Sequence, residues 1–107
     1  RGHIWSAPVL ILVCVNTEKS PHRWREDGAI AALNILLSAH DLGLGAVYVT
    51  AFGSTDPSLT EKIRAVLNLP PNIMPVVLIP LGYASPDAKI EPKELPNLND
   101  ITHNERW

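Results

Sequence analysis

Short apolar runs alternate with polar segments along this chain, and the alternation predicts three strands and two helices. Residues 9–15 form a β-branched and leucine-rich run after Pro8, and residues 74–81 form a second such run. Both faces of these runs are apolar, so we expect strands that are buried on two sides. A shorter apolar run predicts a third strand over residues 46–51.

The first helix is predicted to begin at Ser20, as the capping residue, with Pro21 in its first turn. Its pattern runs to about Asp41, and Gly43 suits the left-handed position just beyond a helix end. The second helix is expected to be capped by Asp56, with Pro57 in its first turn, and to stop before Pro70 and Pro71. Its apolar stripe consists of Leu59, Ile63, Val66 and Leu67.

Residues 84–107 are rich in proline and charge and show no period, so we expect an extended tail that docks on another surface through Trp107. The whole chain, 1–107, is expected to be a single domain. Taken alone, the order strand–helix–strand–helix–strand predicts an α/β unit with parallel strands.

The first helix is unusually apolar. Residues 28–39 contain only two polar side chains, Asn34 and Ser38. One interpretation is an ordinary core helix with Asn34 at the surface. The other is a helix enclosed between its own sheet and a partner, which small side chains would allow to approach closely. The polar stripe is Asp27, Ala31, Asn34, Ser38 and Asp41, and the small residues are Ala31, Ala32 and Ala39.

Composition narrows the class of protein. The net charge is −2 and no basic run is present, which argues against nucleic acid or an anionic membrane as the main partner. The longest apolar run at the start is too short to span a bilayer. The single cysteine, Cys14, permits no disulfide within the chain and is expected to be an inert core thiol. We therefore expect a cytoplasmic protein. Because the chain begins almost directly on a strand, cover from a missing segment or another chain is also expected.

No catalytic side-chain constellation is recognisable. The four histidines do not fall at metal-ligand spacing, so no metal site is predicted. Gly43 and Gly45 follow a helix, whereas the glycines of a dinucleotide-binding fingerprint precede one.

Four segments together resemble the C-terminal half of the nitroreductase family: APVLILVCVN, DGAIAALNILLSAHDLGLGAVYV, AVLNLPPNIMPVVLIPLGY and HNERW. The resemblance implies an α+β fold with a mostly antiparallel sheet flanked by helices and an extended C-terminal tail. It implies an FMN-dependent oxidoreductase, a homodimer, that passes electrons from NAD(P)H to nitroaromatic, quinone or similar acceptors. The tail, residues 84–107, is then expected to dock on the partner subunit.

The resemblance also implies the cofactor-binding residues. The segment after the glycines, Tyr48, Val49, Thr50 and Ala51, is expected to pass the flavin ring and to offer it a backbone amide from Thr50 or Ala51. The alternative is that these are plain strand residues. No side chain is assigned as catalytic.

The phosphate-binding pattern departs from the family. The family's N-terminal basic, serine-containing motif has no counterpart, and Glu94 occupies the position of a basic tail residue, which leaves only Lys93 to meet the phosphate. A second hypothesis is therefore a non-catalytic or truncated dimerisation module that binds FMN weakly or not at all. A third is an unrelated small α/β domain, which a parallel sheet would support.

Overall fold

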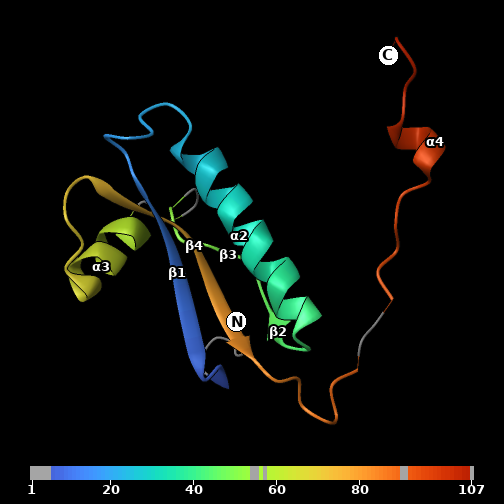
Figure 1. Cartoon of the computed structure of the whole chain (residues 1–107), viewed down its shortest axis with the longest axis horizontal. Helices are drawn as coiled ribbons and strands as arrows, with labels where there is room; N and C mark the ends of the chain where they lie inside the picture. The colour runs from blue at the N-terminus through green and yellow to red at the C-terminus, as the bar shows by residue number, and fades with distance from the viewer. Residues whose placement is uncertain (1–5, 54–55, 57, 90–91, 107) are drawn as a thin grey trace.

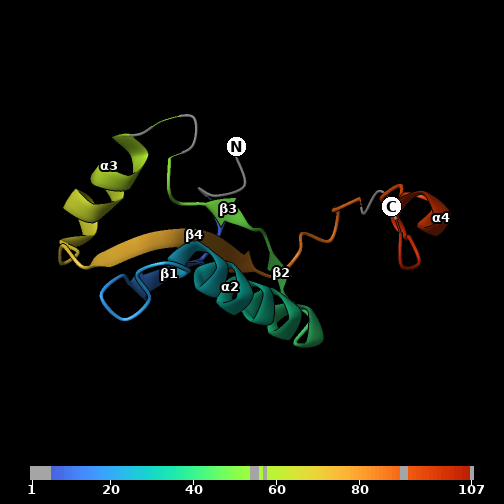
Figure 2. The same ribbon diagram turned by 90° about the horizontal axis from the view of Figure 1, so that it is seen from above.

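A computed structural model of the chain describes residues 6–53, 56, 58–89 and 92–106. Its elements are β1 (Val9–Asn16), α2 (Trp24–Asp41), β2 (Gly45–Ala46), β3 (Val49–Thr50), α3 (Ser58–Leu67), β4 (Ile73–Gly82) and α4 (Leu98–Ile101). The sheet lies between two helices, with α2 along one face and α3 at one end of the other face (Figures 1 and 2).

The sheet is antiparallel throughout the described residues. Strand β4 is central, with β1 on one side and both β2 and β3 on the other. The expectation of a parallel sheet from the order of elements alone is therefore wrong, and the antiparallel arrangement implied by the family resemblance is confirmed. The physical reason is that β1 and β2 do run in the same direction, but β4 inserts between them as an antiparallel neighbour.

Two prolines in β4 shape the strands beside it. Pro75 lies opposite Cys14, and the pairing with β1 shifts there, because Val13 pairs with Val77 and leaves Val76 as an extra residue. Proline has no amide N–H to donate to a neighbouring strand and is therefore found at bulges or at interruptions of the ladder. The bulge places Val76 and Val77 together in the core, where both are fully buried.

The single strand predicted over residues 46–51 is interrupted. The amide of Val47 donates to the carbonyl of Pro80 at 3.3 Å, but the proline cannot return a hydrogen bond. The pairing with β4 is consequently divided into the two-residue strands β2 and β3. The prediction of one continuous strand is wrong for this reason.

Helix α2 begins later than predicted. Residues 17–23 form turns, and the Ser20 hydroxyl donates to the Asp27 carboxylate instead of capping the helix. The predicted C-terminus at Asp41 is confirmed, and Gly43 has the expected positive φ of 72°. The Gly43 amide donates to the His40 carbonyl and the Leu44 amide to the Ala39 carbonyl, which is the Schellman pattern of helix termination.

The core lies between α2 and the sheet. It is built from Val13, Ala32, Val76, Val77 and Ile79. Ala32 and Ala39 are therefore buried against the chain's own sheet, so the expectation that they face a partner is wrong. The predicted polar stripe is exposed along its length, Asn34 included, while Ile30, Leu33 and Leu37 on the outer side of α2 are 62%, 54% and 59% exposed.

Helix α3 is held at both ends. The Asp56 carboxylate accepts hydrogen bonds from the amide and hydroxyl of Ser58, as expected of a helix cap, whereas Pro57 lies outside the described residues. At the other end the Arg64 guanidinium donates to the carbonyls of Pro70 and Ile73. Of the predicted stripe, Leu59 and Ile63 are half-buried, but Val66 and Leu67 are exposed.

Strand β1 is not buried on both sides, because Val9 and Leu10 are about half exposed. The chain exposes 8876 Å² in all, whereas a globular monomer of 11.7 kDa exposes about 5,900 Å². The tail contributes to this excess, since it leaves the sheet and carries only the short helix α4 (Figure 1). Its last residue, Trp107, lies outside the described residues.

Candidate functional site

The predicted flavin-facing segment, residues 48–51, forms the edge of the sheet opposite β1. Val49 pairs with Leu78 and Thr50 pairs with Val77. No further strand among the described residues pairs with the outer side of β3. Within the described part of the chain the segment is therefore an open edge, whose outward backbone groups are available to a ligand.

The pattern of hydrogen bonds decides which backbone groups point outward. The amides of Val47 and Ala51 both donate to β4, to the carbonyls of Pro80 at 3.3 Å and Val76 at 2.9 Å. Successive residues of a strand direct their backbone groups to opposite sides. The amides of Tyr48 and Thr50 consequently point away from β4, towards the open edge.

The two predicted amide donors are thus not equivalent. Ala51 is 1% exposed and its amide is already paired with Val76, whereas Thr50 is exposed and its amide faces outward. Tyr48, which faces outward in the same way, is 43% exposed. The pairing with β4 and the burial of Ala51 distinguish Thr50 from Ala51, and neither is visible in the sequence.

Lys93 lies apart from this edge. It is exposed in the tail together with Glu94, and Figure 1 shows the tail running away from the sheet. The structure therefore brings together residues 48–51 but does not bring Lys93 to them.

An aromatic cluster that the sequence pattern did not indicate lies directly after the segment. Phe52 meets Trp24, the first residue of α2, edge to face, with ring centroids 5.6 Å apart and an interplanar angle of 79°. The Arg25 guanidinium lies 4.2 Å from the Trp24 ring centroid and 5.5 Å from that of Phe52. No periodic pattern links residues 28 positions apart, so the sequence carries no local signal for this contact.

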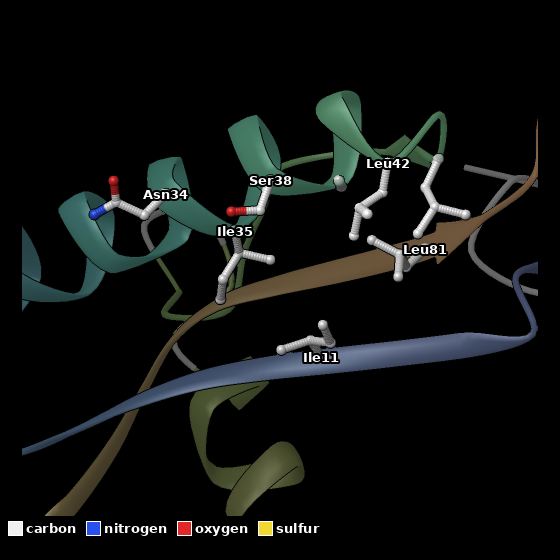
Figure 3. A pocket seen from close by; sticks show the side chains of 8 residues that line it. Ile11, Asn34, Ile35, Ser38, Leu42 and Leu81 are labelled. Atoms are coloured by element: carbon white, nitrogen blue, oxygen red, sulfur yellow. The ribbon is translucent and has the colours of Figure 1, made fainter.

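An apolar groove runs between α2 and the sheet, on the other side of the molecule from the α3 helix. It has a volume of about 300 Å³, and Figure 3 shows Ser38 beside its apolar floor of Ile11 and Leu81. The Asn34 amide group donates to the Ile30 carbonyl of its own helix at 3.2 Å. None of the predicted cofactor-binding residues lines this groove.

The titratable groups add little chemistry to the site. Partial burial raises the pKa of the Cys14 thiol, which suits an inert thiol, but Cys14 is only partly buried and does not belong to the core cluster. The described residues contain no group of three or more His, Cys, Asp and Glu side chains placed to hold a metal ion. Within the same residues, no helix has both the length and the apolar character needed to cross a membrane.

The fold and the sequence together identify the class of protein. The Nitroreductase family model matches residues 1–83. The chain therefore belongs to the nitroreductase family, as the sequence resemblance indicated.

Individual relatives agree with this assignment. A protein of Methanothermobacter thermautotrophicus named "Putative NADH dehydrogenase/NAD(P)H nitroreductase" is 40% identical over 108 residues, which cover 94% of this chain and 51% of the relative. A crystal structure of a Parabacteroides distasonis protein of the same name matches with a TM-score of 0.81 and 38% identity, over 94% of this chain and 57% of that one. An FMN-dependent nitroreductase from Clostridium difficile R20291 matches with a TM-score of 0.75 and 30% identity, over 94% and 59%. The chain spans about half the length of the curated relative from Methanothermobacter.

Proposed function

We propose that this chain forms part of an FMN-dependent oxidoreductase that transfers electrons from NAD(P)H to a nitroaromatic, quinone or similar acceptor. Family membership supports the class of reaction, and the open edge of β3 is the observation that carries the assignment of the site. The cofactor-binding residues in this proposal are Tyr48, Val49, Thr50, Ala51 and Lys93. The flavin, when bound, supplies the hydride chemistry.

The ring end of FMN fits the residues present. A flat ring laid against the edge of β3 meets outward backbone groups of Tyr48 and Thr50, and no charged side chain stands in that segment. The Thr50 amide is the donor that we assign to the ring, because the Ala51 amide is committed to Val76. A fixed amide dipole stabilises negative charge on a reduced ring and does not itself change protonation state.

The phosphate end of FMN fits less well. Lys93 is the one basic residue assigned to it, and the neighbouring Glu94 would repel a phosphate dianion. In this proposal the phosphate is therefore held mainly by residues outside this chain, and Lys93 contributes from the tail.

In this proposal, a second copy of the chain covers apolar surface that a single copy leaves exposed. Ile30, Leu33 and Leu37 form an exposed apolar face on α2, and the chain exposes roughly 3,000 Å² more surface than a globular monomer of its mass. Obligate homodimer interfaces bury about 2,000–5,000 Å² in total, or about 1,000–2,500 Å² on each chain, so a second copy accounts for part of this excess. In the same proposal, the tail, residues 84–107, docks on the partner subunit. The chain forms one domain, and the protein lies in the cytoplasm.

The test of the ring contact is Thr50→Pro, with Ala51→Pro as its matched control. Proline at position 50 removes an outward amide without breaking the bonds to β4, whereas proline at position 51 removes the bond to Val76. We expect Thr50→Pro to leave the melting temperature near that of the wild type and to weaken binding of reduced FMN about tenfold relative to oxidised FMN. Ala51→Pro should lower the melting temperature. Unchanged relative affinity in Thr50→Pro would remove the amide from the proposal.

The alternative function is a non-catalytic or truncated dimerisation module with weak or no FMN binding, and Glu94 is the observation that favours it. Replacement of Glu94 by arginine separates the two functions. If the site is used, Glu94→Arg should tighten FMN binding by about threefold or more, because repulsion becomes attraction. The same substitution at exposed Glu61 on α3 controls for net charge. An affinity that does not respond to Glu94→Arg favours the non-catalytic module.

A further inference from the structure

The segment that carries Thr50 has little to hold it in place by itself. Strand β3 contains two residues, and short strands depend on neighbouring contacts for their position. On the side that follows Thr50, the chain is tied to three different elements. The Ala51 amide bonds to β4, Phe52 packs on α2, and the Gly53 amide donates to the Thr60 hydroxyl of α3 at 3.2 Å.

The middle of these three ties is a clamp made of Trp24, Arg25 and Phe52. The Trp24 and Phe52 rings meet edge to face, which is a favourable arrangement of their quadrupoles, and both rings belong to the partly buried shell of the core. The exposed Arg25 guanidinium covers the Trp24 face at 4.2 Å and reaches the Phe52 ring at 5.5 Å. One cation therefore restrains both rings.

We propose that Trp24 and Arg25 are positioning residues that fix Phe52 and, through it, the direction of the Thr50 amide at the edge of the sheet. The effect that this inference expects on FMN binding rests on the proposed function. The clamp places its aromatic contact two residues after Thr50, so a change in the Phe52 position is transmitted over a short backbone segment. Neither residue touches the flavin in this account.

The experiment compares Trp24→Leu with Trp24→Phe, and Arg25→Gln with Arg25→Lys. Leucine removes the ring but keeps an apolar side chain, and phenylalanine restores a ring. Glutamine removes the cation, and lysine restores it. Two readouts are used. The first is hydrogen exchange at the Ala51 amide, compared with that at the Val77 amide in the core of β4. The second is the ratio of affinities for reduced and oxidised FMN.

We expect Trp24→Leu to speed exchange at Ala51 about tenfold with little change at Val77, since the clamp holds β3 and not the whole sheet. The affinity ratio should fall by about tenfold, which corresponds to about 30 mV in the potential of a two-electron couple. Arg25→Gln should act in the same direction to a smaller extent. Trp24→Phe and Arg25→Lys should restore both readouts in large part.

Equal acceleration at Ala51 and Val77 would show a contact that merely stabilises the fold, and it would overturn the inference. An unchanged affinity ratio in a variant with faster exchange at Ala51 would overturn it as well. Wild-type protein that binds no FMN would reject the proposed function, and the exchange data would then decide separately whether the clamp holds β3.

Discussion

At the scale of single residues, Gly28 of α2 packs closely against Val76 of β4. A Cβ atom built on Gly28 would lie 2.6 Å from the nearest methyl of Val76, which is shorter than any normal contact. Val76 occupies this position because of the bulge beside Pro75 in β4. The proline in β4 and the glycine in α2 are therefore coupled through one valine.

The first prediction concerns this pair. Gly28→Ala should destabilise the fold by about 1–3 kcal/mol, because the new methyl overpacks a core that has no room for it. Val76→Ala also destabilises, by loss of buried methyl groups, but it removes two of the three Val76 atoms that the new methyl would meet and leaves only the Val76 Cβ, 2.7 Å away. The double variant should therefore lose less than the sum of the two single losses, measured by urea unfolding. Strict additivity would contradict the close approach.

Some of these residues could be assigned from the sequence and others could not. Gly43 was predicted to be left-handed because a helix pattern ends directly before it, and its φ of 72° confirms this. Pro75 and Pro80 are equally visible in the sequence, but their effect falls on Cys14 and Val47. Strand pairing decides which residues lie opposite a proline. A local sequence pattern contains no information about that pairing.

At the scale of elements, the predicted apolar runs and helix ends agree with β1, β4 and the C-terminus of α2 within one residue. These features depend on side chains close together in the sequence. The pairing of β1 with β4 depends on residues more than 50 positions apart, and the order of elements alone predicted the wrong direction. The family resemblance supplied the correct, antiparallel arrangement.

The second prediction concerns the start of α3. Hydrogen bonds from the Ser58 hydroxyl and amide, with the Lys62 ammonium as a lesser cause, hold the pKa of Asp56 below its usual value of 3.8. A carboxyl group with a lowered folded-state pKa stabilises the fold above the unfolded pKa, and this contribution is lost as the pH falls through the folded value. Asp56→Asn should therefore lower the melting temperature at pH 7, and the difference from wild type should shrink below about pH 3.8.

Asp56→Ala is the matched comparison, because asparagine keeps an oxygen acceptor for Ser58 and alanine does not. The expected order of melting temperature at pH 7 is wild type, then Asp56→Asn, then Asp56→Ala. A loss in Asp56→Asn that is as large at pH 3 as at pH 7 would show that the charge has no part in the cap.

At the scale of the whole molecule, the candidate site was predictable only in part. The family resemblance implied residues 48–51 as the cofactor-binding segment, which stays a prediction, and our preference for Thr50 over Ala51 within that proposal came from the hydrogen bonds to β4. The apolar character of α2 was plain in the sequence. Only the packing of α2 on the sheet shows that Ala32 faces the sheet and that Leu33 faces away from it. Ala32 is fully buried on the sheet and Leu33 is 54% exposed.

That exposed side of α2 supports the last prediction. In a twofold-symmetric dimer each substitution occurs twice in one interface, so the loss is counted twice. Leu33→Asp removes a leucine whose burial is worth about 1.5–3 kcal/mol and places a charge on the same surface. The dissociation constant of the dimer should rise at least about 100-fold, measured by sedimentation over a range of protein concentrations. Val66→Asp is the control, because Val66 is 83% exposed on α3, on the opposite side of the sheet, and should leave the dimer intact. A wild-type monomer, or equal loss in both variants, would contradict an interface on α2.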